Sequence, residues 1–168
     1  LNLMECPHII ESLLKAPQFA FQKLSLDEYG FSSVTCARLG SLVQRCVSLK
    51  DLFIRINRLE EPLLLGESLK NASHLQSVSI AKKKTRDEAF FDQFVGNGRE
   101  SFVGQLLNPQ CRLKELLLQG TYVKDRHFVT IVELLPTSQV QVLDWSRRHL
   151  GIRPTTSQHQ VLEKSCPC

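Results

Sequence analysis

Apolar residues follow two spacings along this chain, one typical of strands and one typical of helices. Residues 49–57 show the strand spacing most strictly, as Leu-x-x-Leu-x-Ile-x-x-Asn, and residues 113–121 keep it with threonine at the last position. In a β-strand, side chains at positions i and i+2 lie on the same face. Each stretch therefore predicts a short strand that buries one face.

The strand spacing recurs, so the chain contains an internal repeat. Weaker copies lie at 21–29, 75–83 and 140–148, and residues 1–6 match the end of one more. Successive copies are separated by 23, 28, 26, 38 and 27 positions. The second apolar position of each copy, which we call the anchor, falls at Leu1, Leu24, Leu52, Val78, Leu116 and Leu143.

A helical spacing fills the second half of each unit. Val43, Leu69, Leu107 and Leu134 each stand nine residues before the next anchor, and each has an apolar partner three or four residues earlier. Residues at that spacing share one face of a helix. We therefore predict that each unit is a strand followed by a helix, which places the chain in the α/β class.

These stretches resemble the leucine-rich repeat family, and the period of about 26 to 28 residues resembles its ribonuclease-inhibitor-like subclass. The resemblance covers residues 1–148. It implies an open solenoid arc of about six repeats, with parallel strands on the concave face and helices on the convex face. Because the family binds proteins more often than it catalyses reactions, the resemblance also implies a protein partner on the concave face.

The long interval between the fourth and fifth anchors contains an insertion near residues 82–98. A turn at 96–98 is expected to precede the next helix, and if the insertion is a binding protrusion, Phe90, Phe91 and Phe94 anchor it as a short helix. Its basic run is either a solvated loop, a protrusion for an acidic partner or a nuclear-import signal. The cationic residues of the run are Lys82, Lys83, Lys84 and Arg86.

Residues 149–168 lose the pattern and are predicted to form a C-terminal cap or tail, with residues 159–164 as a further helical turn. Cys166 and Cys168 stand too close together, and in too small a number, for a zinc site. Because the chain begins at Leu1, inside a predicted strand, that strand would form an exposed edge of the sheet. We therefore interpret the chain as a piece of a longer protein whose preceding residues cover this edge.

Composition narrows the class of function without identifying it. A net charge of +4 is low for a dedicated nucleic-acid protein, so nucleic acid is an unfavoured partner. No apolar run approaches the roughly 20 residues of a membrane span. The six cysteines are too scattered for a disulfide framework and fit apolar patterns, which favours an intracellular, cytoplasmic or nuclear location.

The sequence lacks several common catalytic and nucleotide-binding motifs. Phosphate-binding glycine loops, zinc-protease motifs and nucleophile elbows are all absent. The five histidines stand near predicted helix edges or strand starts, which indicates solvated or capping roles. We therefore expect no enzyme activity, no cofactor and no metal.

Alternation divides the strand residues into two sets. Leu52, Ile54, Leu116 and Leu118 are predicted to be buried. Trp145 stands in a slot suited to leucine and either fills it or closes the last repeat as a cap. The residues expected on the concave face, and therefore at a partner, are Asp27, Glu28, Phe53, Arg55, Ser79, Leu117, Gln119, Asp144 and Ser146.

The sequence thus favours a protein-protein interaction module, a leucine-rich-repeat fragment of a larger intracellular protein. One alternative is a substrate-adaptor segment of a ubiquitin-ligase assembly, because residues 41–46 resemble the start of the box that binds elongin, although Lys50 stands where that box wants an aliphatic residue. A second alternative is polyanion or nucleic-acid binding through the basic insertion, which predicts salt-sensitive affinity.

Overall fold

The computed structural model describes residues 2–4, 7–15, 20–27, 30–56, 58–82, 92, 94–96, 98–119, 125–144 and 162–163. In this part of the chain the main element is a seven-stranded sheet in the order β1-β2-β4-β6-β7-β8-β9. Its first six strands are parallel, and the last pairs antiparallel to its neighbour. The strands are β1 (Asn2–Met4), β2 (Lys23–Asp27), β4 (Asp51–Ile56), β6 (Ser77–Lys82), β7 (Glu115–Gln119), β8 (Val142–Asp144) and β9 (Leu162–Glu163).

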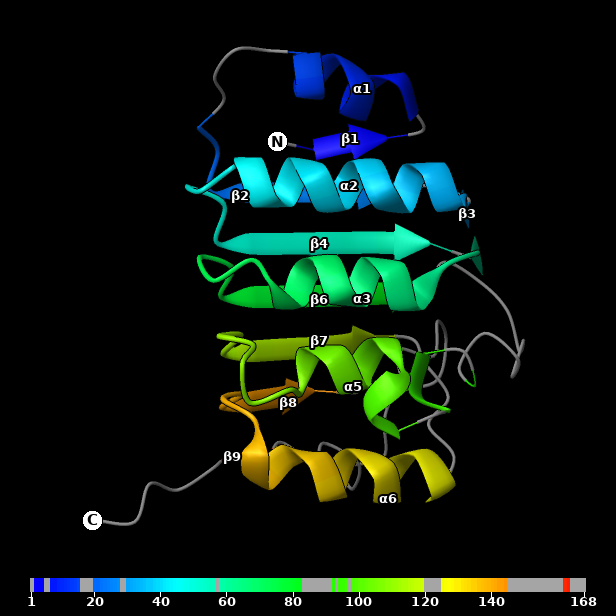
Figure 1. Cartoon of the computed structure of the whole chain (residues 1–168), viewed down its shortest axis with the longest axis vertical. Helices are drawn as coiled ribbons and strands as arrows, with labels where there is room; N and C mark the ends of the chain where they lie inside the picture. The colour runs from blue at the N-terminus through cyan, green and yellow to red at the C-terminus, as the bar shows by residue number, and fades with distance from the viewer. Residues whose placement is uncertain are drawn as a thin grey trace, which may run out of the picture.

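Helices connect the parallel strands, as parallel pairing requires a crossover. Figure 1 shows the strands stacked in chain order, with α2, α3 and α5 in front of one sheet face. Each helix contacts the next helix along the chain. The described helices are α1 (Pro7–Lys15), α2 (Ser33–Arg45), α3 (Pro62–Lys70), α5 (Phe102–Leu106) and α6 (Asp125–Leu134). Two 3-10 turns lie at η1 (Gly98–Glu100) and η2 (Leu135–Thr137). The short strands β3 (Gly30–Phe31) and β5 (Arg58–Leu59) form a separate, parallel two-stranded sheet. The α/β prediction is confirmed.

The predicted anchors occupy equivalent positions in the sheet. Leu24 pairs with Leu52, Leu52 with Val78, Val78 with Leu116, and Leu116 with Leu143. Each of these five residues is buried. The spacing therefore predicted both the strands and their register, including the pairing across the long interval that holds the insertion.

A repeated hydrogen-bond pattern joins the starts of the strands. The Gln22 carbonyl oxygen accepts bonds from the backbone N–H groups of Lys50 and Asp51, at 2.8 and 3.0 Å. The carbonyls that precede β4, β6 and β7 each accept the corresponding pair of bonds from the next strand. One carbonyl thus satisfies two backbone donors at each step from β2 to β8.

The apolar residues of the helices meet those of the strands in one core. Leu52, Ile54, Leu116 and Leu118 are at most 1% exposed, as alternation predicts. The predicted helical pairs are also buried, at Leu39 with Val43, Leu65 with Leu69, Val103 with Leu107 and Ile131 with Leu134. Side-chain caps at Ser32 and Ser101 begin α2 and α5 by accepting bonds from backbone N–H groups three residues on.

Glycines set the spacing between neighbouring helices. Gly40, Gly66 and Gly104 stand at the same position of α2, α3 and α5, twelve residues before the next anchor. A Cβ at Gly40 would lie 2.4 Å from Ser68 Oγ, and one at Gly66 would lie 3.2 Å from the Phe102 Cα atom. The missing side chain therefore permits the close approach of α2 to α3 and of α3 to α5.

Two predictions need correction or completion. The further helical turn at 159–164 is wrong for the part that is described, because Leu162 and Glu163 form β9 and hydrogen-bond to the free edge of β8. The turn at 96–98 precedes η1, where Gly98 has a φ of +59°, and α5 follows at Phe102. Trp145 lies outside the described residues.

Candidate interaction face

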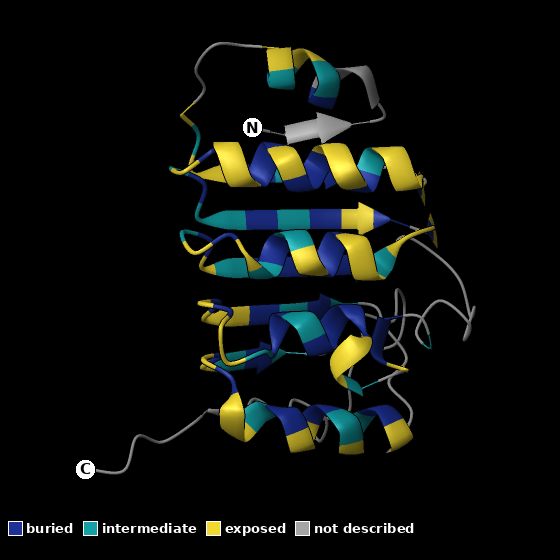
Figure 2. Cartoon of the chain, in the orientation of Figure 1, coloured by how far each residue is buried: buried dark blue, intermediate teal, exposed yellow. Residues whose placement is uncertain are grey.

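The sheet has one face packed against the helices and one turned away from them, and we call the second the open face. Every second strand residue lies on it, and the strand register aligns these residues in rows across the sheet. Figure 2 shows the alternation of burial along β4. The middle row consists of Ser25, Phe53, Ser79, Leu117 and Asp144. The row nearer the strand starts consists of Lys23, Asp51, Ser77, Glu115 and Val142. The row nearer the strand ends consists of Asp27, Arg55, Ala81 and Gln119.

Arg55 is the charged group best held on the open face. Its Nη1 atom lies 3.2 Å from Asp27 Oδ2, and its guanidinium carbon lies 5.5 Å from the centre of the Phe53 ring. The arginine side chain is 46% exposed, whereas the aspartate side chain is 11% exposed. A cation over an aromatic ring is attracted by the ring's negative face. The ion pair and the ring together present one oriented cation above half-buried Phe53.

Small side chains occupy the middle strand of the open face. Ser79 and Ala81 are each 7% exposed, and Ser79 stands in register between Phe53 and Leu117. The Oγ atom of Ser79 is buried and has no hydrogen-bond partner. A buried hydroxyl without a partner costs about 1–3 kcal/mol, so this position carries an unmet demand for a hydrogen bond.

Two carboxylates flank Leu117 on the other side of the open face. Asp144 is opposite Leu117 on β8, and Glu115 is two residues earlier on β7. Glu115 is exposed and Asp144 is half-buried, and neither forms an ion pair in the described part of the chain. By contrast, the Asp51 carboxylate lies 3.0 Å from the Lys23 ammonium. The β7–β8 side of the face is therefore acidic.

The structure brings most of the predicted partner residues onto one surface. Glu28 and Ser146 lie outside the described residues. Asp27 and Ser79 lie on the open face but are buried, because larger neighbours stand beside them in the rows. The predicted set also missed the row that contains Glu115, although its residues obey the same alternation two positions earlier. The predicted residues that share the open face are Asp27, Phe53, Arg55, Ser79, Leu117, Gln119 and Asp144.

The basic insertion is described only at its ends. Lys82 is the last residue of β6 and pairs with Ile56, while Lys83, Lys84 and Arg86 lie outside the described residues, as do Phe90 and Phe91. Phe94 is buried, and its ring centre lies 4.9 Å from that of Phe102 in an edge-to-face arrangement. The expected aromatic anchor is therefore confirmed at Phe94.

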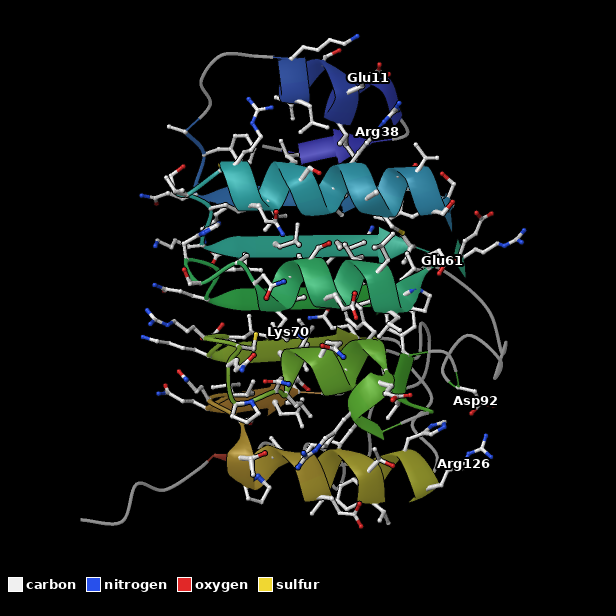
Figure 3. All side chains as sticks on the ribbon, viewed as in Figure 1. Glu11, Arg38, Glu61, Lys70, Asp92 and Arg126 are labelled. Carbon is white, nitrogen blue, oxygen red and sulfur yellow. The ribbon has the colours of Figure 1, made fainter. Side chains whose placement is uncertain are left out.

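A polar cluster joins the insertion to α6. His127 is 2% exposed and its Nε2 atom lies 2.8 Å from Asp92 Oδ1, which Arg126 also contacts. Figure 3 shows Arg126 at the start of α6 and Asp92 on the neighbouring segment. The solvated or capping role predicted for the histidines is wrong here, because the carboxylate gives the buried imidazole a hydrogen-bond partner.

Ionic and polar contacts also join successive helices. Glu11 on α1 lies 3.4 Å from Arg38 on α2, and the Lys70 ammonium donates a 2.7 Å bond to the Gln105 side chain on α5. Figure 3 shows the labelled Glu11 and Arg38 side chains in neighbouring helices. These contacts lie on the helical side, so they support the stacking of helices and leave the open face unaltered.

The described cysteines have a structural role. Cys36, Cys46 and Cys111 are buried and are not joined in disulfide bonds. Burial raises the pKa of the Cys36 thiol to about 11, the negative charge of Glu61 adds to this effect, and a backbone hydrogen bond opposes it. Burial also raises the pKa of Cys111. A thiol that stays protonated at neutral pH is a poor nucleophile.

The residues that resemble the elongin-binding box are part of the core. Leu42, Val43 and Cys46 are fully buried. Their side chains therefore pack inside the molecule and are not presented to a partner in this conformation.

Within the described residues, no cluster of three or more histidine, cysteine or acidic side chains has the arrangement of a metal site. No helix in the same part of the chain combines the length and apolar character that crossing a bilayer requires.

No family model and no curated protein sequence matches this chain significantly.

Proposed function

We propose that this chain is a protein-protein interaction module, a leucine-rich-repeat arc that binds a partner on the open face of its sheet. The equal register of the anchors, the carbonyl pattern at the strand starts and the helices in chain order all support a repeat architecture. In such an architecture the strands form a broad surface that loops do not interrupt.

The observation that carries the proposal is the middle row of the open face. It places two half-buried apolar residues, Phe53 and Leu117, on either side of Ser79. Arg55 stands above the first of them, held by Asp27. An apolar centre with an oriented arginine and a charged surround is the composition of interaction surfaces.

The compartment follows as part of the proposal. Among the described residues, three buried cysteines that form no disulfide bond support a reducing, intracellular environment. An adaptor role in a ubiquitin-ligase assembly is less well supported, because the side chains of its candidate box are in the core.

Affinity capture with quantitative mass spectrometry tests the proposal. The full chain is compared with Phe53→Ser/Leu117→Ser, and with the control Val34→Ser/Val47→Ser, which removes two exposed apolar side chains from α2 and the turn after it (56% and 72% exposed). We expect specific partners to be lost only from the first variant, with both variants folded by circular dichroism. Equal capture by all three proteins would contradict the proposal.

A third variant isolates the basic insertion. Replacing Lys83, Lys84 and Arg86 with serine removes three charges and leaves the open face intact. On our proposal the captured partners remain. Loss of all partners from this variant alone would place binding at the insertion.

A further inference from the structure

The charges of the open face divide it into two unlike halves. On the β2–β4 side, Asp51 pairs with Lys23 and Asp27 pairs with Arg55. On the β7–β8 side, Glu115 and Asp144 have no cation beside them in the described part of the chain. The acidic half lies on a chain with a net charge of +4, so it is a local reversal of the overall charge.

The two acidic residues flank the same apolar side chain. Asp144 is directly opposite Leu117 on the next strand, and neighbouring strands are about 4.8 Å apart. Glu115 is two residues before Leu117 on the same face, which corresponds to about 6.6 Å along the strand. The register therefore separates the two acidic positions by about 8 Å, a span in which one basic side chain can lie between them.

Ser79 provides a second, independent sign of a missing ligand. Its hydroxyl is on the open face, 7% exposed and without a hydrogen-bond partner. Its neighbours along β6, Ser77 and Ala81, are small, whereas Phe53 and Leu117 stand on the strands to either side. A polypeptide main chain that crosses here can offer Ser79 a carbonyl or an N–H group, whose hydrogen bond satisfies the hydroxyl.

We propose that the open face binds a polypeptide segment in which a lysine or arginine stands beside an apolar residue. The main chain of the segment crosses at Ser79, its apolar side chain packs against Phe53 and Leu117, and the basic group lies against Glu115 and Asp144. Charge complementarity identifies the partner class, because an acidic segment would face two uncompensated carboxylates. This inference rests on the proposed function and adds the chemistry of the partner.

Selection of random linear peptides displayed on phage, with the full chain as target, tests the inference. We expect the enriched peptides to contain lysine or arginine next to an apolar residue. For synthetic copies of these peptides, Glu115→Lys/Asp144→Lys lowers the affinity by about tenfold, in keeping with the reversal of two partly exposed charges. The control Glu67→Lys/Glu133→Lys makes the same change in net charge on exposed helical positions and leaves the affinity within about twofold.

The role of Ser79 has its own signature. Ser79→Ala removes a hydroxyl that has no partner in the free chain, so the free chain stays at least as stable. The same change lowers peptide affinity by about two- to tenfold, because the bond to the peptide is lost. Unchanged affinity would remove Ser79 from the proposed site.

The outcomes separate this inference from the function on which it rests. If Phe53→Ala/Leu117→Ala abolishes binding while the Glu115→Lys/Asp144→Lys protein binds normally, the open face is the site and the basic partner is wrong. If neither variant loses binding, both proposals fail. Enrichment without a basic residue, or no enrichment, overturns the inference. A wild-type dimer by sedimentation velocity that the lysine variant abolishes would instead identify a second copy as the occupant.

Discussion

The Arg55 guanidinium lies 3.2 Å from the Asp27 carboxylate on the neighbouring strand, and it stands over the Phe53 ring of its own strand at 5.5 Å. The side chain is thereby fixed in place before any partner arrives. A cation that is already oriented loses less conformational entropy on binding than a mobile one. On the proposed function, Arg55 therefore contributes more to the open face as a binding surface than to the stability of the fold.

Replacement of Arg55 by alanine tests this division. Because the side chain is nearly half exposed, solvent weakens its ion pair, and we expect the free energy of unfolding to fall by no more than about 1 kcal/mol. Urea denaturation measures the change. A loss above about 2 kcal/mol would mean that Arg55 is primarily a structural residue.

Adjacent leucines of β7 should respond differently to truncation. Leu116 is fully buried, so Leu116→Ala removes core contacts and lowers the free energy of unfolding by about 2–5 kcal/mol. Leu117 is half-buried on the open face, and Leu117→Ala should cost clearly less. Equal losses in thermal or urea unfolding would contradict the assignment of the two faces.

The glycine between α2 and α3 should not tolerate a methyl group. Gly40→Ala places a Cβ 2.4 Å from Ser68 Oγ and 2.5 Å from Ser68 Cβ, so the helices must move apart. We expect the resulting strain of about 1–3 kcal/mol to outweigh the gain of about 1 kcal/mol in helix propensity.

A double-mutant cycle with Ser68→Gly identifies the contact responsible. Removing the Ser68 side chain makes room for the new methyl group, so the two changes together should destabilise less than the sum of their separate effects. Ser41→Ala, at an exposed position of the same helix, is the control. Additive effects would show that the close contact is not the source of the strain.

The buried Cys36 thiol should make stability depend on alkaline pH. Burial raises its pKa to about 11, from 9.0 in the unfolded chain. The unfolded chain therefore loses the proton first as pH rises, and the stabilisation present below pH 9 is lost between about pH 9 and 11, by at most about 2–3 kcal/mol. We expect the free energy of unfolding of Cys36→Ala to be lower than that of the wild type at neutral pH, because the change leaves a cavity. It should also decrease less steeply as the pH rises, because the titrating thiol is gone. Parallel stability curves for the two proteins would contradict the buried-thiol account.

The strands and their register could be predicted because one rule determines both. A buried leucine at every second strand position selects the face, and the anchors at Leu24, Leu52, Val78, Leu116 and Leu143 select the alignment. The insertion before Leu116 did not disturb this, because a long loop changes the connection and not the pairing.

Features that depend on contacts between units were harder to predict. The burial of Ser79 depends on Phe53 and Leu117, which are 26 and 38 residues away in sequence. His127 is buried because Asp92, from the insertion, reaches it. The glycines at 40, 66 and 104 carried a visible signal, an identical position in three units. The clashes that explain them appear only in the folded chain, between packed helices at Gly40 and Gly66 and against the η1 backbone at Gly104.

The central claim, that the open face binds a protein partner, is tested most directly by one affinity measurement. The partner identified by capture is titrated by isothermal calorimetry against the wild-type chain and against Phe53→Ala/Arg55→Glu, with the fold of each checked by circular dichroism. We predict that the variant keeps its fold and loses at least about tenfold in affinity, since it removes an apolar contact and reverses the oriented cation. An unchanged Kd with the fold intact would contradict the account and leave the basic insertion as the leading site.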